Sequence, residues 1–461
     1  MFFGITSNNI RPPTPVPSFI LTDTSSTIEN SDAVSTPLTK SLDERLSHLQ
    51  ETVGESHPDV VHALSALGDA CLTNEDHEEA LRYYTQALEV GKKTFPVGHP
   101  SVADTLCSIG NVSMTLSMYQ ESKSSYQAAL DFYRAAFSNR SWATGIDGPP
   151  MQQVDYNIQH KFASTLASMG SLEFEQKNYA AAMKYFEDAL LDSKRAAVTA
   201  VALDRAYPVK GKSTLKQARM FVSEMFNNLA SISAEQGDKA NAIKNYNSAL
   251  ALQMQELGED HPSVAVTLHN IGTMHYRSQE FHYALKSYKQ VLKMRRYLLG
   301  NEHISIAECL LNIATVHEKA GEFERCQSAL NAAIRITAKH HGAQSVQCAH
   351  ITQLIGALNA RSECDEVALE YYDKALELYG EVGLDDDHAS VQSVHNGIAY
   401  IKNKNQDDTS VLDLINNMFN DSCGGLWYTE DTKTSVWNGS GVTSNGVASE
   451  HGASNASAVM V

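Results

Sequence analysis

Apolar residues recur along most of the chain at spacings of three and four, which is the period of one face of an α-helix. Leu64 and Leu67 are spaced in this way. A second kind of segment follows, in which an aromatic residue precedes an alanine and a leucine, as in Tyr84, Ala87 and Leu88. Because residues three and four apart lie on one side of a helix, the pattern predicts amphipathic helices that occur in pairs.

These helix pairs repeat with a fixed period. A small residue in the first helix of each pair recurs every 42 residues in two series, from 68 to 110 and from 272 through 314 to 356. A loop residue lies eleven places before each one, and a second small residue lies twelve places after it. Units of this size cannot bury their apolar faces alone, so we expect an all-α solenoid of stacked helix hairpins. The marked residues are Gly68, Gly110, Gly272, Ala314 and Gly356.

Two further units fit if insertions are allowed. Gly170 and Ala230 then hold the marked position, and each spacing is 60 residues instead of 42. One insertion falls near 138–158 and includes a Gly-Pro-Pro loop. The other falls near 193–217, where we expect a prolonged helix and then a loop through Pro208 and Lys212. With a capping helix that starts at Ser41, about eight repeats fill residues 39–420.

The two ends of the chain differ in composition from the repeats. Residues 1–38 are rich in Ser, Thr and Pro, and residues 421–461 are rich in Gly, Ser, Asn and Thr. Such segments lack the apolar content for a core, so we expect a disordered N-terminal segment and a flexible tail. Trp427 and Trp437 lie in that tail, which could fold back onto the protein's own binding surface.

The units resemble the tetratricopeptide repeat, and more narrowly the 42-residue repeats of kinesin light chains. The resemblance is carried by the string HPSVAVTLHNIG at 261–272, by Ala284 to Tyr288, and by Leu298 to Gly300. It implies a right-handed superhelical solenoid whose first helices line a concave groove. A kinesin light chain would also carry a long coiled coil before its repeats, and residues 1–40 are too short and Pro-rich for one. The similarity is therefore to the cargo-binding part.

The resemblance also indicates where a partner would bind. It places an extended peptide on a polar stripe of the first helices, six and two residues before the marked residue and one and five after it. Asparagine at the second position would hold the peptide backbone, since a carboxamide both donates and accepts hydrogen bonds. Three later cations could receive acidic residues of the peptide. The candidate residues are Asn228, Asn270, Asn312, Glu224, Glu308, Thr273, Thr315, Arg277, Lys319 and Arg361.

Less specific interpretations remain open for these residues. The asparagines could bond only within their own helices or to solvent. The cations could be ordinary solvated side chains. A co-chaperone is the alternative function, yet its carboxylate clamp requires cations at the first two stripe positions, where Asp104, Glu224 and Glu308 stand. A regulatory subunit of a multiprotein enzyme complex is a further alternative.

Composition narrows the class of partner. The formal net charge of −18 argues against nucleic acid, because phosphate binding requires Lys and Arg. A protein or peptide partner therefore remains. No window is apolar enough for a membrane span and the N-terminus has no secretory pattern, so we expect a cytoplasmic protein. The seven cysteines form no Cys-x-x-Cys pair and are interpreted as reduced thiols.

We find no sequence motif for catalysis, a cofactor or a metal. Residues 206–213 approach a phosphate-binding loop, but Ala206 replaces its first glycine and no strand is expected before it. The histidines recur at repeat positions without ligand partners at metal-site spacing, so we interpret them as turn caps or packed side chains. The sequence thus predicts a non-enzymatic adaptor or scaffold without cofactors.

Overall fold

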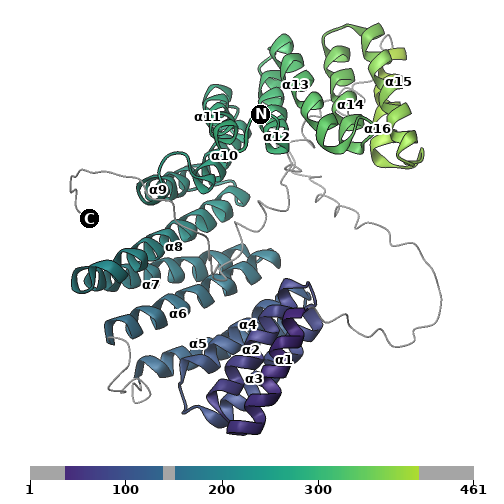
Figure 1. The fold of residues 1–461 in the computed structure, drawn as a ribbon. Helices are drawn as coiled ribbons and strands as arrows, with labels where there is room; N and C mark the ends of the chain where they lie inside the picture. The colour runs from purple at the N-terminus through teal and green to yellow at the C-terminus, as the bar shows by residue number, and fades with distance from the viewer. Residues whose placement is uncertain (1–36, 139–150, 404–461) are drawn as a thin grey trace, which may run out of the picture.

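The computed structural model describes residues 37–138 and 151–403, and all regular structure within these ranges is α-helical (Figure 1). Helix α1 (Pro37–Val53) comes first, followed by seven helix hairpins and one last helix. The first helices of the hairpins are α2 (Pro58–Thr73), α4 (Pro100–Thr115), α6 (Met151–Glu175), α8 (Pro208–Glu235), α10 (Pro262–Arg277), α12 (Ile304–Lys319) and α14 (Val346–Arg361), and α16 (Ala389–Lys402) is last. The second helices are α3 (His77–Thr94), α5 (Tyr119–Ser138), α7 (Tyr179–Ala206), α9 (Lys239–Leu257), α11 (Phe281–Leu299), α13 (Phe323–His341) and α15 (Asp365–Glu381).

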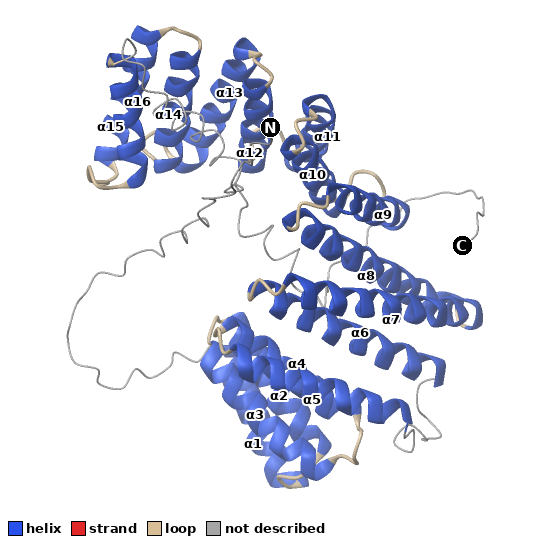
Figure 2. Ribbon diagram, turned by 180° about the vertical axis from the view of Figure 1, so that it is seen from behind, coloured by secondary structure: helices blue, strands red, loops and turns tan. Residues whose placement is uncertain are grey.

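The helices follow one another along an open arc. Each helix packs mainly against those next to it in sequence, and Figures 1 and 2 show this order from opposite sides. In both views α10 and α12 lie on the inner side of the arc, and α11 and α13 lie on its outer side. The expected all-α solenoid of helix hairpins is therefore confirmed.

The marked small residue provides room for an aromatic ring within each hairpin. A Cβ on Gly110 would lie 2.5 Å from Cε1 of Tyr126, sixteen residues later on the second helix. The same contact recurs in other hairpins, where a Cβ on Gly272 would lie 2.8 Å from Cε1 of Tyr288. Because the rings are buried, the glycine sets how closely the two helices of a hairpin approach.

The loop histidines begin the first helices. Nδ1 of His57 accepts a hydrogen bond from the backbone N–H two residues later at 3.2 Å, and His99, His261, His303 and His388 do the same at 3.1–3.3 Å. These bonds satisfy one of the backbone donors left over at a helix start. The prediction that these histidines cap turns is confirmed.

Two expected boundaries were wrong. Helix α1 begins at Pro37, not at Ser41, because proline is favoured in the first turn, where its missing N–H costs no hydrogen bond. The segment from Pro208 to Lys212 is the start of α8, not a loop, for the same reason. The expected prolonged helix is α7, which runs for 28 residues to Ala206.

The buried core is divided among neighbouring hairpins. The largest cluster joins α12, α13, α14 and α15 and contains Leu330, Leu354 and Tyr372. Cys71, Cys309, Cys326 and Cys348 are free thiols in this interior, and Cys364 is exposed.

No helix among the described residues is long and apolar enough to cross a membrane. The predictions for residues 1–36, for the loop at 139–150 and for Trp427 and Trp437 in the tail lie outside the described ranges.

Candidate functional site

The ten candidate residues lie on the first helices α8, α10, α12 and α14, at the positions defined above, which we call the inner stripe. Their accessibility differs from residue to residue. Glu224 and Arg277 are exposed, whereas Asn270, Thr273, Lys319 and Arg361 are half-buried. Asn228, Glu308, Asn312 and Thr315 are buried. The most accessible candidates therefore lie on α8 and α10, and most of those on α12 are buried.

The hydroxyl position of the stripe has a structural role. The hydroxyl of Thr273 lies 3.0 Å from that of Tyr288 and 3.2 Å from the carbonyl oxygen of His269. Ser231 and Tyr246 form the equivalent contact at 3.1 Å. The buried ring that packs on the marked residue thereby gains a partner for its hydroxyl group. Sequence reasoning assigned this position to a ligand, but its hydrogen bonds are internal.

Thr315 also bonds within the fold. Its hydroxyl donates to the carbonyl oxygen of Leu311 at 3.0 Å, and Leu330 replaces the tyrosine in this unit. The two candidate threonines therefore contribute to the helices that carry them.

The three candidate cations each lie beside a carboxylate of their own chain. Arg277 is 3.6 Å from Glu235. Lys319 lies 3.6 Å from Glu318, and Arg361 of the next unit also pairs with Glu318. The Glu318 side chain is fully buried, so its charge requires such partners. The three cations expected to bind a ligand are therefore all in ion pairs within the protein.

Sequence reasoning missed Glu318, although a signal was present. The equivalent position, four after the marked residue, holds Leu72, Met114 and Phe174 in earlier units. A carboxylate at a position that is otherwise apolar predicts a buried ion pair with a cation nearby. Comparison of the units position by position would have revealed it.

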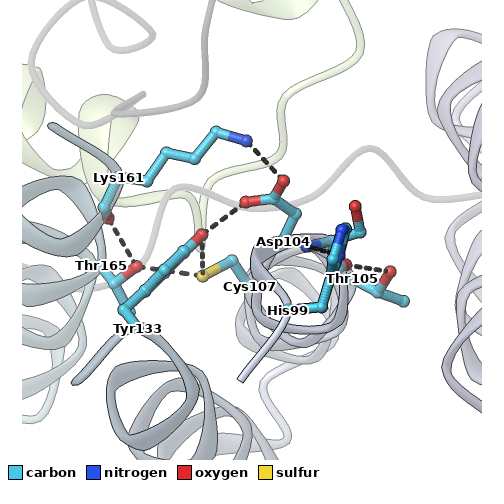
Figure 3. Close-up of polar contacts among 8 residues, drawn as sticks. His99, Asp104, Thr105, Cys107, Tyr133, Lys161 and Thr165 are labelled. Atoms are coloured by element: carbon cyan, nitrogen blue, oxygen red, sulfur yellow. Dashed lines mark hydrogen bonds and ion pairs between the residues drawn. The ribbon is translucent and has the colours of Figure 1, made fainter. Parts of the chain in front are cut away.

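Two of the three acids at the first stripe position are also paired. Glu308 accepts a hydrogen bond from Arg295 on α11 at 3.1 Å. Asp104 accepts one from the Tyr133 hydroxyl at 2.6 Å and pairs with Lys161 on α6 (Figure 3). These contacts join neighbouring hairpins, so both acids take part in stacking.

The Asp104 cluster extends through polar side chains into the interior. Figure 3 shows the thiol of Cys107 between Tyr133 and Thr165, with its sulfur 3.0 Å from the threonine hydroxyl. Burial raises the pKa of Cys107 to about 11. The thiol is therefore protonated near neutral pH and unsuited to nucleophilic chemistry.

Glu224 differs from the other two acids. Its side chain is exposed, and no ion pair or hydrogen bond joins it to another residue in the described ranges. Desolvation by the surrounding protein nevertheless raises its pKa to about 7. Desolvation also raises the pKa of Glu308 to about 7, against the lowering effect of Arg295.

The three asparagines lie at the same position of three successive first helices, and we call them the asparagine ladder. Asn228 is 9% exposed and Asn312 is 8% exposed. Neither side chain forms a hydrogen bond to another described residue. Asn270 is half-buried between them in the sequence of units. The amide atoms of both side chains still reach solvent, since neither residue is among those with a buried polar atom that lacks a partner. A ligand could therefore supply their hydrogen bonds.

Other titratable side chains form contacts within the fold. Nδ1 of His275 lies 2.7 Å from Glu280, and His269 packs against the ring of Tyr288. Within 37–138 and 151–403, no three His, Cys, Asp or Glu side chains are grouped as a metal site. The described chemistry is thus that of a surface with hydrogen-bonding amides.

Comparison with known families agrees with this architecture. Two models of the tetratricopeptide repeat match the sequence, one at 40–93 and 221–296 and the other at 162–197. No curated protein matches the sequence significantly.

Solved structures of repeat proteins are similar in fold. The apo form of RapI is 15% identical, with a TM-score of 0.51, over 78% of this chain and 86% of that one. BtubC (BKLC) from P. vanneervenii is 17% identical, with a TM-score of 0.44, over 58% and 92%. Nearly identical repeats of a putative kinesin light chain from Podosopora anserina are 15% identical, with a TM-score of 0.37, over 50% and 96%. The chain thus contains tetratricopeptide repeats over the residues that the two family models match.

Proposed function

We propose that this protein is a non-enzymatic adaptor that binds an extended segment of a partner protein along the asparagine ladder. Tetratricopeptide repeats are in general protein-interaction scaffolds, and this coarser function is supported by the family match. The finer proposal rests on one observation. Asn228 and Asn312 are buried amides without a hydrogen-bonding partner among the described residues.

The carboxamide groups of the ladder suit an extended peptide. The carboxamides of Asn228 on α8 and Asn312 on α12 each offer a donor and an acceptor, and Asn270 lies at the same position of α10 between them. Such groups can satisfy backbone N–H and C=O groups of any sequence, as sheet edges do in other modes of peptide recognition. The ladder would therefore supply affinity, and neighbouring side chains would supply selectivity.

In this proposal Glu224, and not the three candidate cations, determines which peptides are favoured. Arg277, Lys319 and Arg361 already have carboxylate partners, which weakens the case for an acidic ligand. Glu224 lies one helical turn before Asn228 and is exposed. A ligand with a basic or hydrogen-bond-donating residue next to α8 would be favoured, because an opposite charge lowers the pKa of a partly desolvated carboxyl group.

The test is a pull-down from a cell lysate with the full chain, followed by mass spectrometry. The variant carries Asn228→Leu, Asn270→Leu and Asn312→Leu. We expect it to lose partners that the wild type captures, because the leucines cannot bond to a peptide backbone. Retention of the same partners would refute the asparagine ladder.

A matched control separates this effect from a general increase in surface hydrophobicity. Asn247→Leu, Gln290→Leu and Asn331→Leu make the same kind of change on exposed positions of α9, α11 and α13. This control should keep the partners. Recovery of chaperone C-termini would instead favour a co-chaperone, and recovery of a stoichiometric catalytic chain would favour a regulatory subunit.

An intramolecular contact with the tail is a second part of the proposal. A segment with Trp427 and Trp437 beside Glu430 and Asp431 has the composition of a ligand that folds on binding. Removal of 421–461 should then raise the affinity for a captured peptide. Unchanged affinity would remove the tail from the proposal.

A further inference from the structure

The outer face of α11 carries an unusual run of positive charge. Helix α11 contains five Lys and Arg residues and no Asp or Glu, in a chain with a net charge of −18. Arg295 forms an ion pair with Glu308. The other four cations are exposed, follow one another at steps of three and four, and form no ion pair with any residue that the structure describes. They are Lys286, Lys289, Lys293 and Arg296.

The outer face of α15 carries the opposite charge at the same places of the repeat. Lys286, Lys289 and Lys293 correspond to Glu370, Asp373 and Glu377, since each pair is separated by two 42-residue periods. The three acids and Glu366 are all exposed, and among the described residues none of them is in an ion pair. Lys374 is the single cation of α15. Two helices of one solenoid thus present complementary rows.

These rows cannot meet within one molecule, because α13 and its hairpin partner lie between them. We propose that the α11 face of one copy of the chain docks on the α15 face of a second copy. An antiparallel alignment forms four opposite-charge pairs, whereas a parallel alignment places Arg296 against Gly380 and forms three. The four antiparallel pairs are Lys286 with Glu377, Lys289 with Asp373, Lys293 with Glu370, and Arg296 with Glu366.

The exposed apolar side chains fit the same alignment. Tyr297 is 74% exposed at the end of α11, and Val367 is 41% exposed at the start of α15. Antiparallel pairing brings these two ends together. At 1.5 Å per residue the row on α11 extends over about 15 Å and the row on α15 over about 16.5 Å, so the two differ by one residue.

A second copy suits these observations better than other anionic partners. The net charge of −18 repels a second copy as well as a polyanion, so it is the matched row of carboxylates on α15, and not the overall charge, that favours a second copy. A second copy supplies a row of carboxylates at the required spacing. The association would be sensitive to salt, because exposed charges are screened beyond about 10 Å at 0.1 M.

Charge reversal on full-length protein tests the proposal by sedimentation velocity over a concentration series. One variant carries Lys286→Glu, Lys289→Glu and Lys293→Glu, and the other carries Glu370→Lys, Asp373→Lys and Glu377→Lys. Each variant alone has rows of like charge, so we expect its self-association to weaken at least about tenfold. A mixture of the two has complementary rows again and should form a mixed complex.

The control places the same charge change elsewhere. Lys92→Glu, Lys93→Glu and Lys244→Glu alter exposed cations on α3 and α9, and this variant should associate like the wild type. A wild type that stays monomeric at about 0.05 M salt overturns the proposal. It is also overturned if neither reversal weakens association, or if the control weakens it equally.

Discussion

Replacement of Gly110 by alanine tests how the hairpins are held together. The added Cβ would lie 2.5 Å from Cε1, 2.6 Å from Cδ1 and 3.0 Å from Cζ of Tyr126. The ring is fully buried, and its hydroxyl donates to Asn111 at 2.6 Å. The ring therefore cannot move away without loss of packing and of a hydrogen bond, so the two helices must separate.

The expected cost follows from two opposing effects. Overpacking of a filled core costs about 1–3 kcal/mol, whereas alanine in place of a helical glycine contributes about 0.5–1 kcal/mol of stability. The net effect is a destabilisation of about 0–2.5 kcal/mol. Ala230 opposite Tyr246 shows that a hairpin can accommodate the extra methyl group, which keeps the estimate at the low end.

Another hairpin of the same chain shows which second substitution should relieve the overlap. Ala314 faces Leu330 in the corresponding hairpin, so Tyr126→Leu should remove most of the penalty of Gly110→Ala. Urea denaturation followed by circular dichroism gives the free energies of the four proteins of this double-mutant cycle. Hydrogen exchange of α4 and α5 locates the change within the solenoid.

A matched control isolates the steric effect from helix propensity. Gly380 lies in α15 and has no atom within 4 Å of a Cβ, so Gly380→Ala should stabilise by about 0.5–1 kcal/mol. Our account of the hairpin contact is refuted if Gly110→Ala stabilises to the same extent. It is also refuted if Tyr126→Leu leaves the penalty unchanged.

Three further predictions concern buried polar groups. Burial lowers the pKa of His269 to about 3, below its unfolded value of about 6.5. The contribution of the neutral imidazole to the free energy of unfolding is therefore complete above pH 6.5 and is lost as the pH falls toward 3. By pH 5 the loss of stability amounts to about 2 kcal/mol. His269→Leu, which copies Leu311 of the next unit, should flatten the pH dependence of urea unfolding, and an unchanged slope would exclude His269 as its source. Arg361→Leu should destabilise by about 2–3 kcal/mol because Glu318 loses its partner, and Glu318→Leu in the same chain should restore part of that loss; additive losses would contradict a coupled pair. His303→Ala should cost about 1 kcal/mol in thermal unfolding through the lost helix cap, whereas no change would show that Nδ1 does not cap α12.

The fold could be predicted because the same signals recur in most units. The marked glycine, the loop histidine and the aromatic of the second helix define the hairpin together, so chance matches at one position do not matter. The insertions interrupt this period. Pro58, Pro100 and Pro262 each lie ten residues before the marked residue, whereas Pro208 lies 22 before Ala230, so the repeat does not identify it as a helix start. A proline in the first turn of a helix produces the same local sequence as a loop.

The site was harder to predict than the fold because the position of a residue within the repeat does not indicate which side chains it will contact. Thr273 and Tyr288 are fifteen residues apart, and their contact depends on how closely the two helices pack. Arg361 meets Glu318 across two first helices. A polar stripe in the sequence therefore combines internal ion pairs with groups available to a ligand, and only the stacked structure separates them.

Site-specific photo-cross-linking of a captured partner tests the central claim most directly. A benzophenone amino acid replaces Glu224 on the inner stripe in one protein and Lys244 on the outer face of α9 in another; both positions are exposed. We predict that the partner cross-links from position 224 and not from position 244. Cross-linking from 244 alone, or equally from both, would contradict binding of the partner along the asparagine ladder.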